Sequence, residues 1–348
     1  MPDGNFLKIL ILKPSSLGDV IHALPVLRLI KLRYPTAQVS WWLESSLVPL
    51  LENDPDLDRI FPFIRNSWAS PANWPGLISS VRALRQERFD VAIDLQGLAR
   101  SAVFTWLTNS GLNLGLSNPR EGGREGAHMA YDRTPPQCAT GTHAVDRYLA
   151  VLPMLDVPVH QQFDWLPERL SVAASVREKW NPGATRWISL LPGARWDNKR
   201  WPVEYFRDLT VQILRQYPDV KISVLGSRSD RDLGARIASV NPHRCLDLTG
   251  RTSLLEMIEW IRLNELVITN DTGPMHVAAA LRRPVLALFG PTAPGSTGPY
   301  GQIDKVLQDK SLNCIPCLKS RCGYKESLAC LLALTPERVS VEVKRRLG

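Results

Sequence analysis

The chain has 348 residues, of which 44% are hydrophobic and 22% charged, and its formal net charge is +8. This composition excludes a disordered or fibrous chain, and the length favours two domains over one. The basic residues form no run of five or more, which argues against a nucleic-acid-binding tail. The charge fits simple solubility, an anionic ligand or an acidic membrane surface.

The first half of the chain alternates between apolar runs and segments with helical spacing of apolar residues. The first apolar run, at 6–12, contains Lys8 and is too short to span a bilayer, so we expect a buried strand in a cytoplasmic protein. The pattern predicts strands at 7–12, 38–43, 60–63 and 89–95, and helices at 20–33, 45–53, 77–87, 99–108 and 142–155. A segment rich in glycine, charge and proline, at 119–136, interrupts the alternation and is either functional or mobile.

The alternation starts again after 182. The second half predicts strands at 187–191, 221–225, 245–247, 266–269 and 285–289, and helices at 202–216, 230–238, 254–263, 274–280 and 336–347. Such alternation is typical of a parallel sheet covered on both faces. We therefore predict two α/β domains whose sheets face each other across a cleft, at 1–165 and 185–334. Residues 166–184 are the predicted linker, and a final helix at 335–348 is expected to pack back on the first domain.

The most informative motif is the polar turn Asn270-Asp271-Thr272-Gly273, between an apolar strand and a helix start. Unpaired backbone N–H groups and the positive end of the helix dipole suit a phosphate there. Gly273 allows close approach of the phosphate to the backbone, and His276 on the first helical turn is either structural or a hydrogen-bond donor to a phosphate or sugar.

Three further charged residues follow predicted strands. Asp19 is either the N-cap of the helix at 20–33 or a general base at the edge of the cleft. Lys199, in a loop with Gly193 and two tryptophans, is either solvated or a phosphate partner. Asp230 is either an N-cap or an acceptor for ribose hydroxyls.

Four cysteines cluster late in the chain with the spacing C-x2-C-x4-C-x7-C, at Cys314, Cys317, Cys322 and Cys330. They are either reduced structural thiols or ligands of a structural zinc or iron ion. Only the first pair has the spacing of a common metal knuckle.

Several motifs are missing from the sequence. The first strand is not followed by G-x-G-x-x-G, which argues against a dinucleotide oxidoreductase. There is no Walker lysine motif and no G-x-S-x-G elbow. No D-x-D pair occurs in a suitable turn, which points away from a magnesium-dependent sugar transferase.

Six segments, in this order, resemble the family-9 glycosyltransferases, the ADP-heptose:lipopolysaccharide heptosyltransferases. They are LKPSSLGDVIHALPVL, VAIDLQGLARSA, HAVDRYL, DNKRWP, TNDTGPMHVAAAL and LFGPTAPG. The first three are most similar to the type I enzyme, whereas the cysteine cluster is more similar to type II enzymes and to protein heptosyltransferases with cysteine-bound iron. The resemblance covers nearly the whole chain and implies a GT-B fold of two Rossmann-like domains.

The resemblance implies an inverting transfer of heptose from ADP-heptose to a lipopolysaccharide inner-core acceptor of the Kdo–lipid A type, without a catalytic metal. Asp19 resembles the family's general base, and Lys199 the lysine that pairs with the diphosphate. The expected donor-binding residues are Ser15, Ser16, Gly193, Ala194, Arg195, Asp230, Thr252, Asp271, Thr272, Gly273 and His276. The expected acceptor-binding residues are Asp94, Gln96, Arg100, His143 and Arg147.

The same resemblance implies a monomer, peripheral to the anionic inner face of the inner membrane, that binds no nucleic acid. Three alternatives remain at the level of sequence. The enzyme could transfer another sugar or use another acceptor, such as a protein or another glycan. It could be a GT-B sugar-nucleotide epimerase or hydrolase, or a non-enzymatic protein that binds nucleotides or nucleic acid.

Overall fold

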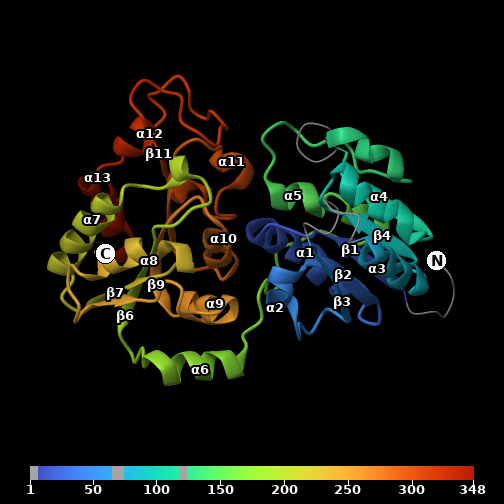
Figure 1. Ribbon diagram of the computed structural model, residues 1–348, viewed down its shortest axis with the longest axis horizontal. Helices are drawn as coiled ribbons and strands as arrows, with labels where there is room; N and C mark the ends of the chain where they lie inside the picture. Colours follow the sequence, from blue (N-terminus) through green and yellow to red (C-terminus); the bar gives the residue numbers. More distant parts are fainter. Residues whose placement is uncertain (1–6, 65–73, 118–123) are drawn as a thin grey trace. The chain divides into compact units, whose positions relative to one another are not determined.

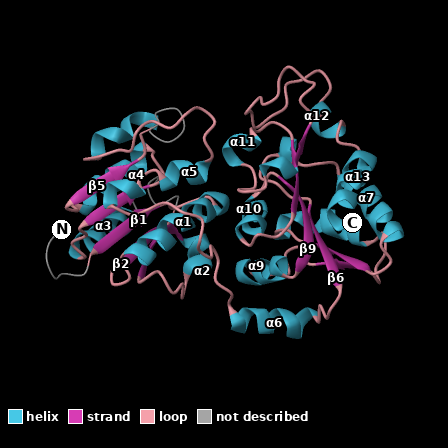
Figure 2. Cartoon of the chain, turned by 180° about the vertical axis from the view of Figure 1, so that it is seen from behind, coloured by secondary structure: helices cyan, strands magenta, loops and turns pink. Residues whose placement is uncertain are grey.

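The computed structural model describes residues 7–64, 74–117 and 124–348. The chain divides into two compact units, Met1–Trp165 and Leu166–Gly348. Each unit contains one parallel β-sheet with helices packed around it (Figure 1 and Figure 2). The predicted pair of α/β domains is therefore confirmed.

The first unit is built on a five-stranded sheet with the order β3-β2-β1-β4-β5. Its strands are β1 Lys8–Leu12, β2 Gln38–Glu44, β3 Arg59–Phe63, β4 Val91–Asp94 and β5 Leu112–Gly115. Its α-helices are α1 Leu17–Arg33, α2 Val48–Leu51, α3 Trp74–Gln86, α4 Ala99–Thr108 and α5 Ala144–Leu149. The strand order reverses between β1 and β4, so the loops after these two strands diverge at a topological switch point, where open α/β sheets bind ligands.

The second unit is built on a six-stranded sheet with the order β11-β10-β9-β6-β7-β8. Its strands are β6 Arg186–Leu191, β7 Val220–Val224, β8 Cys245–Asp247, β9 Asn264–Asn270, β10 Val285–Phe289 and β11 Val306–Gln308. Its α-helices are α6 Leu170–Trp180, α7 Val203–Gln216, α8 Arg231–Ala238, α9 Leu254–Arg262, α10 Gly273–Ala280, α11 Pro294–Thr297, α12 Ala329–Leu332 and α13 Pro336–Leu347. Here the order reverses between β6 and β9, which places the loops after these strands at the second switch point.

Some elements differ from the sequence predictions. The helix predicted at 142–155 is interrupted after Leu149 and resumes only as the 3₁₀ turn Leu152–Leu155, because Pro153 lacks the N–H that an α-helix needs. The helix predicted at 45–53 consists of a 3₁₀ turn and the short α2. The strands β5 and β11 are absent from the sequence predictions, because LNLG and VLQ each contain only two apolar side chains and form no clear pattern. Residues 119–123 of the glycine- and proline-rich segment lie outside the described ranges.

Helix α6 occupies most of the predicted linker. Ala173 and Val176, three residues apart, are its buried positions, and the helix packs on α9. The two residues at the boundary, Trp165 and Leu166, each accept a hydrogen bond from an arginine of their own unit. Arg28 donates to the carbonyl of Trp165 from 3.1 Å, and Arg262 donates to the carbonyl of Leu166 from 3.1 Å.

The C-terminal helix α13 packs against α7 in the second unit. Its Val339 and Val343 are part of the hydrophobic core of that unit, together with Phe206 of α7. The expected contact of this helix with the first domain stays a prediction. Within the described ranges, no helix combines the length and the apolar character needed to cross a membrane.

Candidate functional site

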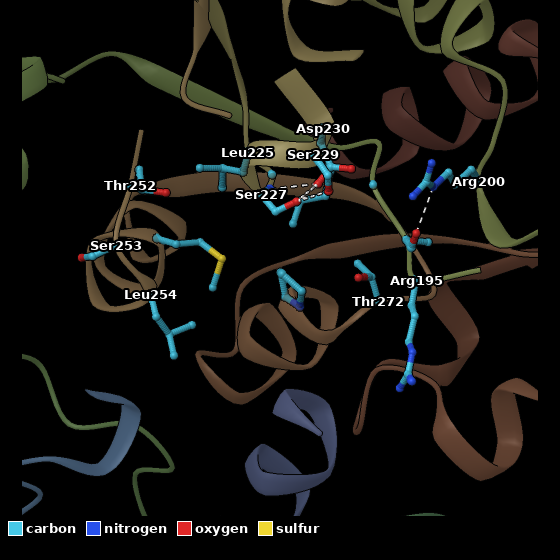
Figure 3. A pocket seen from close by; sticks show the side chains of 16 residues that line it. Arg195, Arg200, Leu225, Ser227, Ser229, Asp230, Thr252, Ser253, Leu254 and Thr272 are labelled. Atoms are coloured by element: carbon cyan, nitrogen blue, oxygen red, sulfur yellow. Dashed lines mark hydrogen bonds between the residues drawn. The ribbon is translucent and has the colours of Figure 1, made fainter. Parts of the chain in front are cut away.

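The second unit has a cavity of about 530 Å³ at the carboxyl ends of its central strands (Figure 3). The loops after β6, β7 and β9 and the starts of α9 and α10 contribute its walls. Six of the expected donor-binding residues line it, namely Gly193, Ala194, Arg195, Asp230, Thr252 and Thr272. Figure 3 shows Thr252 and Leu254 at one end and Arg195 and Arg200 at the other. Segments far apart in sequence thus form one pocket, as their positions after neighbouring parallel strands require.

The start of α10 provides a backbone donor at this pocket. Thr272 is the N-cap residue in an extended conformation, and Gly273 and Pro274 begin the helix. Pro274 has no N–H and the N–H of Met275 donates to the carbonyl of Thr272 at 3.1 Å, so the N–H of Gly273 is the donor that this helix start offers, and the helix dipole adds partial positive charge there. This arrangement favours an anionic group beside Thr272.

Asn270 explains why the loop that carries Lys199 lies beside this turn. The buried amide of Asn270 donates to the carbonyl of Pro192 from 2.8 Å, and its oxygen accepts from the backbone N–H of Trp201 at 3.1 Å. One side chain therefore fixes both ends of the loop after β6. Asn270 itself was not predicted to have this role.

Lys199 lies within this loop and is paired with Asp271. Its Nζ is 2.6 Å from Oδ2 of Asp271 and 4.6 Å from the centre of the Trp196 ring. The same Oδ2 accepts a hydrogen bond of 2.6 Å from Oγ1 of Thr292. Two of the residues expected from the sequence are thus directly in contact, and Thr292 is an addition that the sequence patterns did not indicate.

Asp230 is buried and lies on the wall formed by the loop after β7. Its Oδ2 accepts from the backbone N–H of Ser227 at 2.8 Å and from the Ser227 hydroxyl at 2.6 Å. A Cβ on Gly193 would lie 2.7 Å from this carboxylate, so glycine is needed for the approach of the two loops. The Asp230 side chain does not cap α8, and a contact with a ribose stays a prediction.

In the first unit, Asp19 is the third residue of α1 and not its N-cap. The helix begins at Leu17, and Ser16 is the capping residue. Oδ2 of Asp19 accepts from the N–H and the hydroxyl of Ser16, at 2.9 and 2.7 Å. The interpretation of Asp19 as an N-cap was wrong, because the helix starts about one turn earlier than predicted. Its side chain is 42% exposed, so it is accessible to a substrate.

Lys13, the buried residue that directly follows β1, was missed by the sequence analysis. Its Nζ donates to the carbonyl of Leu95 from 3.1 Å and lies 3.9 Å from Oδ1 of Asp19. The side chain is only 3% exposed and passes over the ring of Tyr148 in α5. Burial works against the charge of Lys13, but Tyr148 and Asp19 outweigh it and raise the pKa of Lys13 above its ordinary value. The only sequence signal for Lys13 is a lysine at the end of an apolar strand.

Asp94 is fully buried at the end of β4. Its carboxylate accepts from the N–H groups of Gln96 and Gly97, at 2.8 and 3.0 Å, and from the Tyr131 hydroxyl at 2.7 Å. Burial raises the pKa of Asp94 in spite of these hydrogen bonds, and burial together with Asp94 raises the pKa of Tyr131. Asp94 thus shapes the turn before α4, on which Arg100 is exposed.

His143 lies at the start of α5 and Arg147 in its last turn. His143 is its N-cap, and its Nδ1 accepts from the N–H of Val145 at 3.2 Å. Arg147 donates to the carbonyl of Thr142 from 2.7 Å. The ring of His22 in α1 lies 5.1 Å from that of His143, edge to face. The structure therefore brings His143 next to the helix that carries Asp19. Contacts with an acceptor stay predictions for all five expected residues, Asp94, Gln96, Arg100, His143 and Arg147.

The four late cysteines all line one small cavity, together with Asn198. All six cysteines of the chain are free thiols. Hydrogen bonds from the backbone lower the pKa of Cys322, whereas burial raises that of Cys330. Among the residues that the structure describes, no group of three or more His, Cys, Asp or Glu side chains is arranged to hold a metal ion. A structural zinc or iron ion at these cysteines is therefore not supported.

Comparisons with known proteins agree on one family. The model of glycosyltransferase family 9 (heptosyltransferase) matches residues 77–328. Lipopolysaccharide heptosyltransferase 1 of Pseudomonas aeruginosa is 31% identical, over 98% of this chain and 98% of its own length. Lipopolysaccharide heptosyltransferase 2 of Salmonella typhimurium is 28% identical, over 98% of this chain and 99% of its own length. Among solved structures, the Escherichia coli heptosyltransferase WaaC with ADP superposes with a TM-score of 0.77 at 24% identity, over 98% of this chain and 100% of that one.

Proposed function

Because the chain belongs to glycosyltransferase family 9, the heptosyltransferases, and is thus a glycosyltransferase, we propose that it transfers heptose from ADP-heptose to a lipopolysaccharide inner-core acceptor of the Kdo–lipid A type. The relatives that match over almost the whole chain act, by their names, on lipopolysaccharide. The observation that carries the proposal is the cavity of the second unit, lined by six residues expected to bind the donor.

The diphosphate of the donor binds between Lys199 and the start of α10. Lys199 is held within the loop after β6 by its pairing with Asp271, and the N–H of Gly273 follows Thr272 at the start of α10. As the bond to the sugar breaks, negative charge grows on the diphosphate, and these fixed donors stabilise it. The Lys199 ammonium and the helix dipole replace the metal ion that stabilises the diphosphate in other glycosyltransferases, so the transfer needs no metal.

Asp19 acts as the general base. An acceptor hydroxyl attacks the anomeric carbon from the face opposite the diphosphate, ADP leaves, and the hydroxyl proton passes to the Asp19 carboxylate. The configuration at the anomeric carbon is therefore inverted. Exposure of the side chain and the nearby Lys13 cation support this role.

The place of action follows from the acceptor. A lipid-linked acceptor is presented at the inner face of a membrane, and a net charge of +8 favours an anionic surface. We propose a monomer at the cytoplasmic face of the inner membrane, with an acceptor domain at 1–165 and a donor domain at 185–334.

A thermal-shift screen of nucleotides and nucleotide sugars tests the donor. A ligand at 100 times its dissociation constant adds about 2.7 kcal/mol to the free energy of unfolding. We expect ADP and ADP-heptose to raise the melting temperature, and UDP- and GDP-sugars to leave it unchanged. A shift with UDP- or GDP-sugars alone would overturn the proposed donor.

Incubation with donor alone separates transfer from the related reactions. A transferase leaves most ADP-heptose intact until an acceptor is added. An epimerase changes the sugar without an acceptor, and a hydrolase releases free heptose. Either of these products at the rate of the complete reaction contradicts the proposal.

A further inference from the structure

Thr292 lies in the loop that follows β10, outside the set of residues that form the walls of the donor cavity. It is 8% exposed, and its hydroxyl donates to Oδ2 of Asp271 at 2.6 Å. The same oxygen is 2.6 Å from Nζ of Lys199. We propose that Thr292 is a positioning residue: it fixes the Asp271 carboxylate and, through it, the Lys199 ammonium that faces the diphosphate. This inference rests on the proposed function of Lys199.

The loop around Thr292 is itself anchored, which is what a positioning residue needs. The side-chain amide of Gln308 in β11 donates to the carbonyls of Gly290 and Thr292, at 3.0 and 2.7 Å. The N–H of Leu318 donates to the carbonyl of Pro291 from 2.8 Å. The hydroxyl of Thr292 is therefore presented from a backbone that is fixed on both sides.

Lys199 needs such support because its side chain is flexible. A lysine ammonium is a point charge on a flexible four-carbon stem, and its direction is set by its partners. Asp271 is 7% exposed and holds the ammonium on one side, while the Trp196 ring lies 4.6 Å from it. Pairing with one carboxylate oxygen uses one of the three donors of the ammonium. If the hydroxyl of Thr292 is removed, the carboxylate can rotate and the ammonium moves with it.

The inference predicts a loss that is specific to the diphosphate. Thr292→Val keeps the shape of the side chain and removes the hydroxyl. We expect kcat to fall about tenfold, with the KM for the acceptor unchanged. In calorimetry, ADP should bind several-fold more weakly to this variant, whereas AMP, which lacks the second phosphate, should bind as before.

Two further variants serve as controls. Thr292→Ser keeps the hydroxyl and should restore both kcat and ADP affinity. Thr297→Val makes the same change in the short helix α11 and should leave both unchanged. If Thr292→Val does not fold by thermal melting, Thr292→Ala, which also lacks the hydroxyl, carries the same expectation.

The outcomes separate this inference from the proposed function. If Lys199→Ala weakens ADP binding and transfer but Thr292→Val does not, Thr292 has no positioning role. Equal losses of AMP and ADP affinity in Thr292→Val would also overturn the inference, because they indicate general damage to the pocket. If Lys199→Ala itself leaves ADP affinity and transfer unchanged, the proposed role of Lys199 is wrong.

Discussion

Asp19 is oriented by the turn that precedes its own helix. Ser16 binds one oxygen of the carboxylate through its N–H and hydroxyl, and the Lys13 ammonium lies near the other. The sequence placed Asp19 after a strand and a polar turn, which is enough to propose a base. It could not reveal Lys13, because a buried lysine is recognised only from its neighbours in the fold.

Replacement of Asp19 by Asn tests the base. Asn keeps a side chain of the same size near Ser16 but cannot take up a proton at neutral pH. We expect the rate of transfer to fall by at least about 100-fold, since general-base catalysis contributes roughly 10²–10⁴-fold. ADP affinity should be unchanged, and Asp208→Asn, at an exposed position of α7, should have no effect. A variant that keeps more than about a tenth of the rate contradicts the role of Asp19.

The sequence predicts secondary structure well where apolar runs are long, and poorly where an element forms only because it packs against a neighbouring element. β1 and β9 are nearly continuous buried strands and are evident from sequence. β5, with the sequence LNLG, has too few apolar residues for a pattern, and becomes a strand because β4 is beside it. Helix α6 has two buried positions and depends on its contact with α9.

The ring of Tyr131 packs directly on the backbone of β5 at Gly115. A Cβ on Gly115 would overlap this ring, so glycine is needed there. We expect Gly115→Ala to displace Tyr131 from Asp94 and to reduce the free energy of unfolding by about 1–3 kcal/mol, measured in urea. Gly323→Ala, outside helices and strands, where a Cβ meets nothing within 4 Å, is the control. Equal stability of the two variants would argue against the packing of Tyr131 on Gly115.

The contact between α6 and α9 should depend on pH. Burial works against the charge of Glu256, but hydrogen bonds from Lys179 and Ser253 outweigh it, and its pKa lies below the ordinary value of 4.5. A lowered pKa in the folded state gives stability that is complete above the unfolded-state pKa and is lost as the pH falls through the folded pKa. We therefore expect Glu256→Gln to melt at a lower temperature than the parent protein at pH 7.

The difference in melting temperature should shrink as the pH is lowered below about 4.5. Glu178→Gln, an exposed position on α6, should match the parent protein throughout. If the melting temperature of Glu256→Gln lies below that of the parent protein by the same amount at pH 7 and below about pH 4.5, the charge of Glu256 does not contribute to stability.

At the scale of the molecule, each of the two α/β units has one parallel sheet and places polar loops at the switch point of that sheet. Alternation along the sequence predicts both sheets, and the motifs predict a donor site in one unit and a base in the other. The walls of the proposed donor pocket follow from the sequence only in part. Ser227 and Met257 line it, but a serine in a turn and a methionine on an amphipathic helix have no distinctive sequence signal.

The transfer reaction itself is the sharpest test of the proposed function. The purified protein is incubated with ADP-heptose and a Kdo–lipid A acceptor in the presence of a chelator, and the product is analysed by mass spectrometry and NMR. We predict that the acceptor gains one heptose, that ADP is released in equal amount, and that the anomeric configuration is inverted relative to the donor. The proposed function is wrong if the acceptor gains no heptose, if the product retains the configuration of the donor, or if chelation of divalent metal stops the reaction.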